Sequence, residues 1–186
     1  MIVILEGCNG VGKSAYAAAL ASYLDAPVLR PFRPSPDHHW NGRTPLEGLL
    51  RHLGVPINTH VDDLYIADIL GQLGPLAPRD VVLDRSVPSA IAYGSAGSDP
   101  GGLYDYWQSQ LRGLSHVVYV WLVCPWELAR ERADGRWFPG LESYQRLENS
   151  FDGLFEEFAG DKLIIDTKAT GFIEEGVERI LNAYPR

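Results

Sequence analysis

The sequence predicts an α/β fold in which a parallel sheet lies between two layers of helices. Short apolar runs alternate along the chain with longer helix-like stretches, which is the order expected of repeated β–α units. The runs are continuous rather than alternately apolar and polar, as is typical of parallel strands covered on both faces. Such sheets bind ligands at the carboxyl ends of their strands, so we expect the chemically important residues to meet at one edge.

The expected elements follow one another along what we take to be a single domain, residues 1–186. The apolar runs of strand length are residues 2–5, 27–29, 81–83, 117–123 and 163–165. Helical patterns cover residues 14–24, 64–73, 88–93, 103–111, 126–133, 144–158 and 173–181. Tyr104, Tyr106 and Trp107 recur at near-helical spacing, and we expect them to pack against the core.

Composition argues against some classes of function. The formal net charge of −8 disfavours broad binding to nucleic acid, because such binding depends on Lys and Arg. Cys8 and Cys124 have neither metal-ligand spacing nor the pattern of a disulfide framework, so a reduced, cytoplasmic setting is expected. We expect no signal peptide before the first strand, and no apolar run approaches the roughly 18 residues that span a membrane.

The segment after the first apolar run has the pattern of a phosphate-binding loop. Residues 7–14 read Gly-Cys-Asn-Gly-Val-Gly-Lys-Ser, which matches G-x-x-x-x-G-K-[ST] between a strand and a helix. Backbone N–H groups of such a loop surround phosphates, while Lys13 would reach the β- and γ-phosphates and Ser14 would ligate Mg²⁺. A glycine-rich turn without a ligand is the alternative. The residues expected to bind ATP here are Gly7, Asn9, Gly10, Val11, Gly12, Lys13 and Ser14.

A second polar group follows the strand expected at residues 81–83. Asp84 stands at its carboxyl end, where a carboxylate can hold Mg²⁺ opposite the phosphate loop. Arg85 comes next, and its guanidinium could bind phosphate or carboxylate oxygens. Alternatively, Asp84 would cap the helix at residues 88–93 and Arg85 would form a surface ion pair. The neighbouring phosphate loop favours the functional interpretation.

Three segments together resemble thymidylate kinases and the related deoxynucleoside kinases. They read Glu-Gly-x-Asn-Gly-x-Gly-Lys-Ser at residues 6–14, Asp-Arg-Ser-x-x-Ser-x-x-x-Tyr at residues 84–93, and Arg-x-x-x-Arg at residues 132–136. The likeness covers nearly the whole chain in order and spacing. The first segment is shared by P-loop proteins in general, and the second is the more diagnostic one.

The resemblance implies a three-layer P-loop NTPase fold of the nucleoside-monophosphate-kinase type, with a five-stranded parallel sheet, that transfers the γ-phosphoryl group of ATP. It implies a short lid at about residues 130–140 and an acceptor-side loop at about residues 30–60. Arg132 and Arg136 lie four residues apart on one helix face and would close over ATP, with Arg130 nearby. Taken alone, these arginines would suggest only a solvated helix face. The catalytic residues that the resemblance implies are Lys13, Asp84, Arg85, Arg132 and Arg136.

The acceptor side departs from the family pattern. Asn9 replaces the acidic residue that contacts the acceptor sugar in thymidylate kinases, although an amide can still bind a hydroxyl. Tyr65 matches the aromatic residue that stacks on thymine, but Ile69 replaces the arginine that reads the base edge. Deoxynucleoside kinases place a general-base Glu after the second strand, where this chain has no carboxylate before Asp37. Base recognition must therefore differ from that of thymidylate kinases.

The arginines of the same loop, Arg30 and Arg33, favour an anionic acceptor, because a phosphate needs little base catalysis and gains from nearby positive charge. Simple solvent exposure of this loop is an equal alternative. The residues expected to bind the acceptor are Asn9, Arg33, Asp37, Tyr65 and Arg85. We therefore expect an ATP- and Mg²⁺-dependent kinase that acts on a deoxynucleoside monophosphate, as dTMP kinases do, or on a close analogue.

Other functions remain open from the sequence. A deoxynucleoside kinase could act on a 5′-hydroxyl with Asp37 or Asp84 as base. A kinase acting on a modified base such as 5-hydroxymethyluracil in viral DNA is a further alternative, which the acidic composition does not encourage. The non-enzymatic alternative is a nucleotide-gated binding module, which would bind ATP without transferring its phosphoryl group. The resemblance also allows a homodimer, and no membrane partner is expected.

Overall fold

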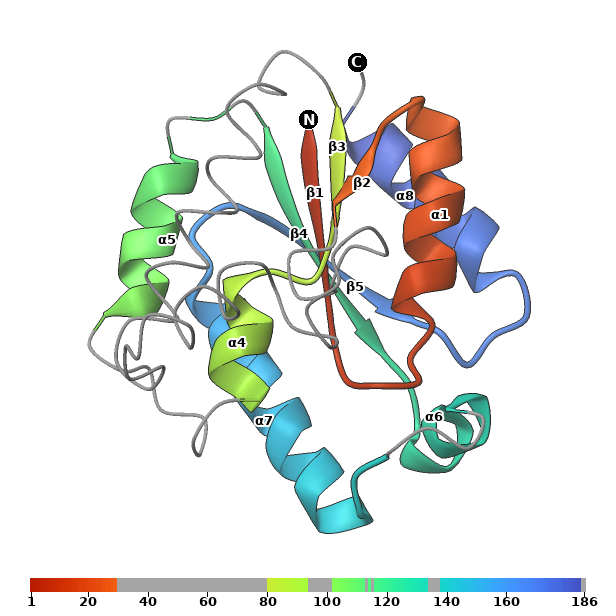
Figure 1. The fold of residues 1–186 in the computed structure, drawn as a ribbon. Helices are drawn as coiled ribbons and strands as arrows, with labels where there is room; N and C mark the ends of the chain where they lie inside the picture. Colours follow the sequence, from red (N-terminus) through yellow and green to blue (C-terminus); the bar gives the residue numbers. More distant parts are fainter. Residues whose placement is uncertain (30–79, 94–101, 113, 115, 134–137, 185–186) are drawn as a thin grey trace, which may run out of the picture.

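The computed structural model describes residues 1–29, 80–93, 102–112, 114, 116–133 and 138–184. Its centre is a five-stranded sheet in the order β2-β3-β1-β4-β5, in which every pairing is parallel (Figure 1). The strands are β1 (Ile2–Glu6), β2 (Val28–Leu29), β3 (Val81–Asp84), β4 (Val117–Val123) and β5 (Asp161–Asp166). The fold class expected from the sequence is confirmed.

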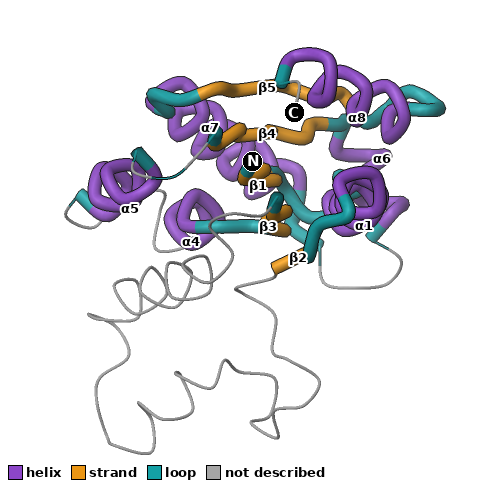
Figure 2. The backbone as a smooth tube through the Cα atoms, turned by 90° about the horizontal axis from the view of Figure 1, so that it is seen from above, coloured by secondary structure: helices purple, strands orange, loops and turns teal. Residues whose placement is uncertain are grey.

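Helices cover both faces of the sheet. They are α1 (Lys13–Leu24), α4 (Val87–Tyr93), α5 (Leu103–Leu111), α6 (Trp126–Arg132), α7 (Leu141–Glu157) and α8 (Phe172–Ala183). Helices α1 and α8 lie on one face, and α4, α5 and α7 lie on the other (Figures 1 and 2). The short helix α6 lies beyond the carboxyl end of β4 (Figure 1). The helix expected at residues 64–73 lies outside the described residues.

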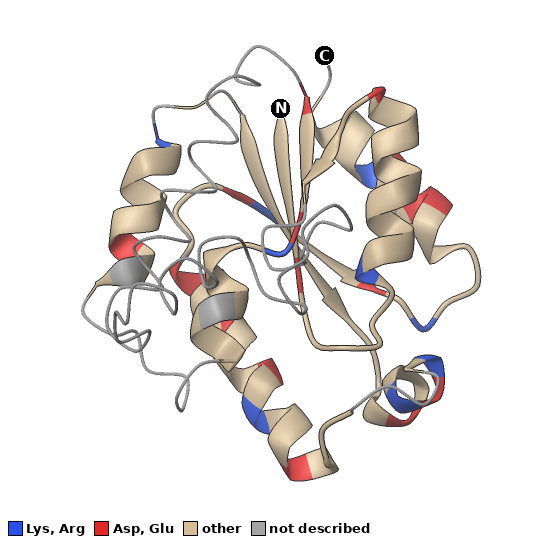
Figure 3. Cartoon of the chain, viewed as in Figure 1, with Lys and Arg blue, Asp and Glu red and all other residues tan. Residues whose placement is uncertain are grey.

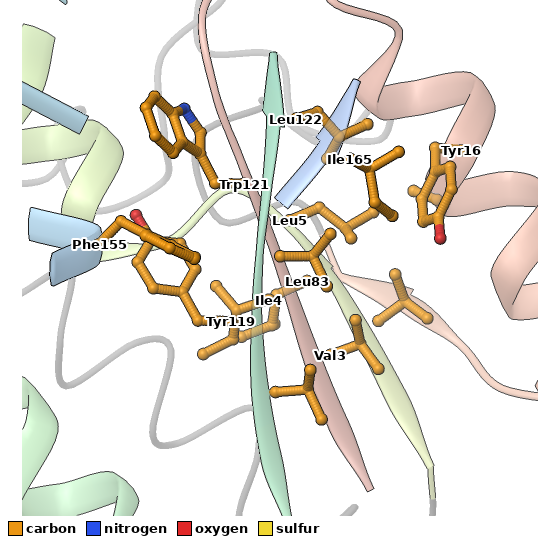
Figure 4. Packing of buried hydrophobic residues seen from close by; sticks show 14 of the residues in the cluster. Val3, Ile4, Leu5, Tyr16, Leu83, Tyr119, Trp121, Leu122, Phe155 and Ile165 are labelled. Carbon is orange, nitrogen blue, oxygen red and sulfur yellow. The ribbon is translucent and has the colours of Figure 1, made fainter. Parts of the chain in front are cut away.

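The core forms on both faces of the central strands. All five residues of β1 are buried, because the strand has parallel neighbours on both sides and helices on both faces. Tyr119 and Trp121 point to the face covered by α7, where their rings lie 5.4 and 5.6 Å from that of Phe155 (Figure 4). Ile165 points to the opposite face, towards Tyr16 of α1 (Figure 4).

Two expectations about burial need correction. The strand β5, at the edge of the described sheet, is not covered on both faces: Ile165 is buried, whereas Ile164, whose side chain points to the other face, is 41% exposed. Tyr104 and Trp107 pack in the core as expected, but Tyr106 is 51% exposed. Residues three apart on a helix share a face, and Tyr106 lies between them on another face.

The helices and the two cysteines are further features of the described residues. No helix among them is both long enough and apolar enough to cross a membrane. Cys8 and Cys124 are both buried and not joined in a disulfide.

The difference between a buried and an exposed isoleucine tests this packing. Ile4→Ala removes a fully buried side chain from β1 and is expected to lower the free energy of unfolding by about 2–5 kcal/mol. Ile164→Ala, on β5, is the matched control and is expected to lower it by less than about 1 kcal/mol. Urea denaturation at constant m-value measures both. Equal losses would contradict this placement of the core.

Candidate functional site

The loop between β1 and α1 has a shape that depends on glycine. Gly12 ends the loop at φ 93° as the N-cap residue of α1, and Gly10 adopts φ 81°. Both angles lie in the left-handed region that L side chains rarely adopt. A Cβ at Gly10 would also overlap the backbone carbonyl of Ala129 in α6. The loop therefore passes directly against α6, and no described side chain caps the first turn of α1.

Lys13 lies at the centre of this loop. Its Nζ donates hydrogen bonds to the carbonyl oxygens of Gly7 at 2.8 Å and Cys8 at 2.5 Å. The side chain is buried, and that burial, together with the nearby positive charge of Arg85, lowers the pKa of Lys13 to about 7. An anion in the loop would favour the protonated amine and raise this pKa.

Ser14 and Asp84 join the start of α1 to the end of β3. The Ser14 hydroxyl donates to Oδ2 of Asp84 at 2.9 Å. The structure thus places Asp84 against the start of α1 and the loop that precedes it. Hydroxyl and carboxylate oxygens are ligands that suit Mg²⁺, which keeps waters and phosphate oxygens as its other ligands. These two residues therefore fit the ion, although no group of three His, Cys, Asp or Glu residues in the described chain could hold a metal alone.

Arg85 follows Asp84 and reaches the loop from the β3 side. Its Nη2 donates to the side-chain oxygen of Asn9 at 2.7 Å, and its Nη1 donates to the hydroxyl of Ser89 at 2.8 Å. The guanidinium also lies 4.9 Å from the centre of the Tyr93 ring. Two residues expected at the acceptor side, Asn9 and Arg85, are therefore in direct contact, and the guanidinium is held on several sides.

Glu6, the last residue of β1, was not among the residues expected at the site. The side chain is completely buried, and its two oxygens accept hydrogen bonds from the Ser86 N–H, at 2.5 Å, and from the Ser89 hydroxyl. Burial raises its pKa to about 7, and the charge of Arg85 is the largest opposing influence. The sequence feature that could have indicated Glu6 is a carboxylate at the end of an otherwise apolar strand. Burying a carboxylate costs free energy unless it has hydrogen-bonding partners, so such a residue is expected to have a specific role.

Arg132 ties α6 to the segment between β5 and α8. Its guanidinium donates to the hydroxyl of Thr167 at 3.0 Å and to the carbonyl of Thr167 at 2.8 Å. It also lies 5.6 Å from the centre of the Phe172 ring. Arg130 lies on another part of the same helix, over the ring of Trp126 at 5.1 Å. The hydrogen-bond partner of Arg132 lies 35 residues away along the chain, so the motif could not indicate this contact.

Several of these groups line one cavity of about 770 Å³ at the carboxyl edge of the sheet. Basic residues, drawn in blue in Figure 3, lie in the first turn of α1 and in parts of α6 at this edge. Gly7 and Val11 help to fix the loop. The carbonyl oxygen of Gly7 accepts a hydrogen bond from Lys13, and the side chain of Val11 is buried in the core. Arg33, Asp37, Tyr65 and Arg136 lie outside the described residues. The cavity is lined by Asn9, Gly10, Gly12, Lys13, Ser14, Ala15, Asp84, Arg85, Arg132, Ala133, Phe172 and Ile173.

Solved structures resemble this fold over nearly its whole length, whereas no family model and no curated protein sequence matches the chain. Deoxyadenosine kinase from M. mycoides with bound dATP is 15% identical, has a TM-score of 0.61, and 98% of each chain is covered. The YorR protein of Bacillus subtilis, in complex with phosphorylated GDP, is 18% identical with a TM-score of 0.60, over 98% of this chain and 95% of that one. A gluconokinase from Sinorhizobium meliloti is 17% identical with a TM-score of 0.54, over 97% of this chain and 93% of that one. The chain therefore has the three-layer fold of P-loop kinases.

Proposed function

We propose that this protein is an ATP- and Mg²⁺-dependent kinase whose acceptor carries a phosphate, with a deoxynucleoside monophosphate as the first candidate. One observation carries the proposal: a single cavity brings Lys13, Ser14 and Asp84 beside the guanidinium of Arg85. The first three suit a donor polyphosphate, and Arg85, which follows Asp84 at the end of β3, is placed where an acceptor would lie. Phosphoryl transfer needs alignment and charge neutralisation more than covalent help, and these residues supply both.

The donor side is proposed on the loop and the start of α1. Lys13 and the backbone N–H groups of the loop would neutralise the β- and γ-phosphates, helped by the positive end of the helix dipole. Ser14 and Asp84 would hold Mg²⁺, which when bound supplies further positive charge beside the phosphates. Arg132 lines the same cavity and is proposed to contact the donor, with Arg136 as a second lid arginine.

The surroundings of Arg85 support an anionic acceptor. In the described part of the chain, the atoms that accept its hydrogen bonds are neutral oxygens, on the Asn9 amide, the Ser89 hydroxyl and the Gly7 carbonyl. Among the described residues Arg85 therefore has no direct ion pair, and its positive charge can serve an acceptor phosphate. The nearest carboxylates are engaged elsewhere, Glu6 with two donors and Asp84 with Ser14.

A deoxynucleoside kinase is the second candidate. The likeness to a deoxyadenosine kinase over nearly the whole chain favours it, and Asp84 at the rim of the cavity is the described carboxylate that could accept a hydroxyl proton. Asp37, the other base considered, lies outside the described residues. The gluconokinase likeness adds sugar acids to the acceptors worth testing.

A coupled ADP-release assay with Mg-ATP tests these proposals. The acceptors are the four deoxynucleoside monophosphates, the four deoxynucleosides, gluconate and duplex DNA that contains 5-hydroxymethyluracil. Turnover of a monophosphate is the expected result. Turnover of a deoxynucleoside alone would favour the second candidate, and turnover of the DNA would favour the modified-base kinase. ATP binding without turnover of any acceptor would identify a nucleotide-gated module and contradict the proposal.

Arg85→Ala separates the acceptor from the donor side. A lost hydrogen bond to a charged group corresponds to about 1.5–3 kcal/mol, so KM for the monophosphate should rise roughly 10- to 100-fold. The dissociation constant of ATP should change little. The control is Arg146→Ala on the exposed surface of α7, which should alter neither constant. Equal weakening of ATP and acceptor by Arg85→Ala would contradict the assignment.

The low pKa of Lys13 predicts that ATP binding takes up a proton. The free amine is mostly neutral at pH 8, because its pKa is about 7, and the bound polyphosphate favours the charged form. We expect uptake approaching one proton at pH 8 and much less at pH 6, measured by titration calorimetry in buffers with different ionisation enthalpies. Lys13→Arg keeps a fixed charge and should reduce the uptake at pH 8. Uptake that does not depend on pH, or on this substitution, would show that Lys13 is already charged.

A further inference from the structure

We propose that Glu6 is a positioning residue for Arg85: its carboxylate acts through the Ser86 N–H and the Ser89 hydroxyl to hold the guanidinium towards the cavity. This inference deepens the proposed function and rests on it, since Arg85 is proposed to bind the acceptor. Glu6 itself does not line the cavity and is completely buried, so it can act only through these neighbours.

The first part of the inference concerns the backbone of Arg85. This residue has φ 83°, a left-handed conformation that residues other than glycine rarely adopt. Hydrogen bonds to β1 hold it on both sides: the Arg85 N–H donates to the carbonyl of Leu5 at 3.0 Å, and the Ser86 N–H donates to the Glu6 carboxylate at 2.5 Å. The turn after β3 is thus fixed against the end of β1.

The second part concerns the side chain of Arg85. The Ser89 hydroxyl has one proton, which it donates to Glu6, and an oxygen lone pair that accepts from Nη1 of Arg85 at 2.8 Å. The carboxylate therefore sets the direction of the hydroxyl, and the hydroxyl sets the position of the guanidinium. A protonated Glu6 could donate instead of accept, which would free the Ser89 proton to turn towards Arg85.

Within the described residues, the charged and titratable groups around Glu6 come from four parts of the chain. Arg85 in the turn after β3 and Lys13 at the start of α1 favour the ionised carboxylate, while the phenols of Tyr104 on α5 and Tyr119 on β4 also lie near it. Burial outweighs the two positive charges and raises the pKa of Glu6 to about 7. The orientation of Ser89 is therefore sensitive to pH in the neutral range.

A double-mutant cycle tests the relay with dTMP as acceptor and Mg-ATP as donor. Glu6→Gln can still accept from the Ser86 N–H, but its amide would donate to Ser89 and reverse that hydrogen bond. Ser89→Ala removes the hydroxyl and leaves the bond between Glu6 and Ser86. Each change should raise KM for dTMP about tenfold at pH 8, a loss of roughly one hydrogen bond to a charged group. The double variant should be no worse than either single one, because both break the same path.

The controls separate positioning from stability. KM for ATP and the melting temperature should change little in any of these variants, and the exposed Ser109→Ala on α5 should leave KM for dTMP unchanged. In the unaltered enzyme KM for dTMP should rise as the pH falls from 8 to 6. The share of this rise that is due to Glu6 should disappear in Glu6→Gln. Additive effects in the cycle, or an equal rise in KM for ATP, would overturn the inference.

A measurement without substrate distinguishes failure of the inference from failure of the proposed function. In the ligand-free protein, the Nε–Hε NMR signal of Arg85, assigned with Arg85→Lys, should shift with a midpoint near pH 7. The shift should be absent in Glu6→Gln. A signal that does not titrate in the unaltered protein would overturn the positioning role. Absence of dTMP turnover, with the shift present, would instead contradict only the proposed monophosphate acceptor.

Discussion

The parallel pairing of β1 with β3 is the constraint on which the site depends. It places Leu5 beside Asp84, so the two chain segments that follow these strands begin at the same edge of the sheet. The phosphate loop comes from one strand, and Asp84 and Arg85 come from the other. Residues about 70 to 80 positions apart in sequence therefore meet with their hydrogen-bonding groups already directed at one cavity.

This pairing also concentrates charge in a buried place. Lys13 and Arg85 approach the same loop from opposite sides, and each positive charge disfavours the other. Water does not compensate them fully, because Lys13 is almost completely buried. An anion in the cavity would relieve both the repulsion and the lost solvation, so the arrangement favours a highly charged ligand over a neutral one. Polyphosphates are the ligands that the loop geometry suits best.

The parts of the fold that were predictable from the sequence are those encoded locally. Central strands appear as continuous apolar runs because both faces are covered, and the phosphate loop is a contiguous motif whose backbone shape needs glycine. The exposure of β5 and of Tyr106 was not predictable in this way. An apolar run has the same pattern in a central or a terminal strand, so its burial depends on which strands and helices are its neighbours.

The missed parts of the site depend on contacts between distant residues. Glu6 and Ser89 are 83 positions apart, and Arg132 and Thr167 are 35 apart. A motif names such residues but does not say which atoms meet, because that follows from strand register and from where each helix begins. Burial of a carboxylate at a strand end is the physical signal that such a contact must exist, since an unpaired buried charge is too costly to keep.

The two acidic or amide groups near Arg85 divide the task of holding it. Asn9 touches the guanidinium directly but is neutral, so it fixes the position of Arg85 without cancelling its charge. Glu6 is the group that can be charged, and it is kept one hydroxyl away from the guanidinium, behind Ser89. An aspartate at position 9 would form a direct ion pair and leave less of the positive charge for a ligand. An amide in front and a carboxylate behind therefore orient the arginine while its charge remains directed into the cavity, which is the arrangement that an anionic acceptor requires.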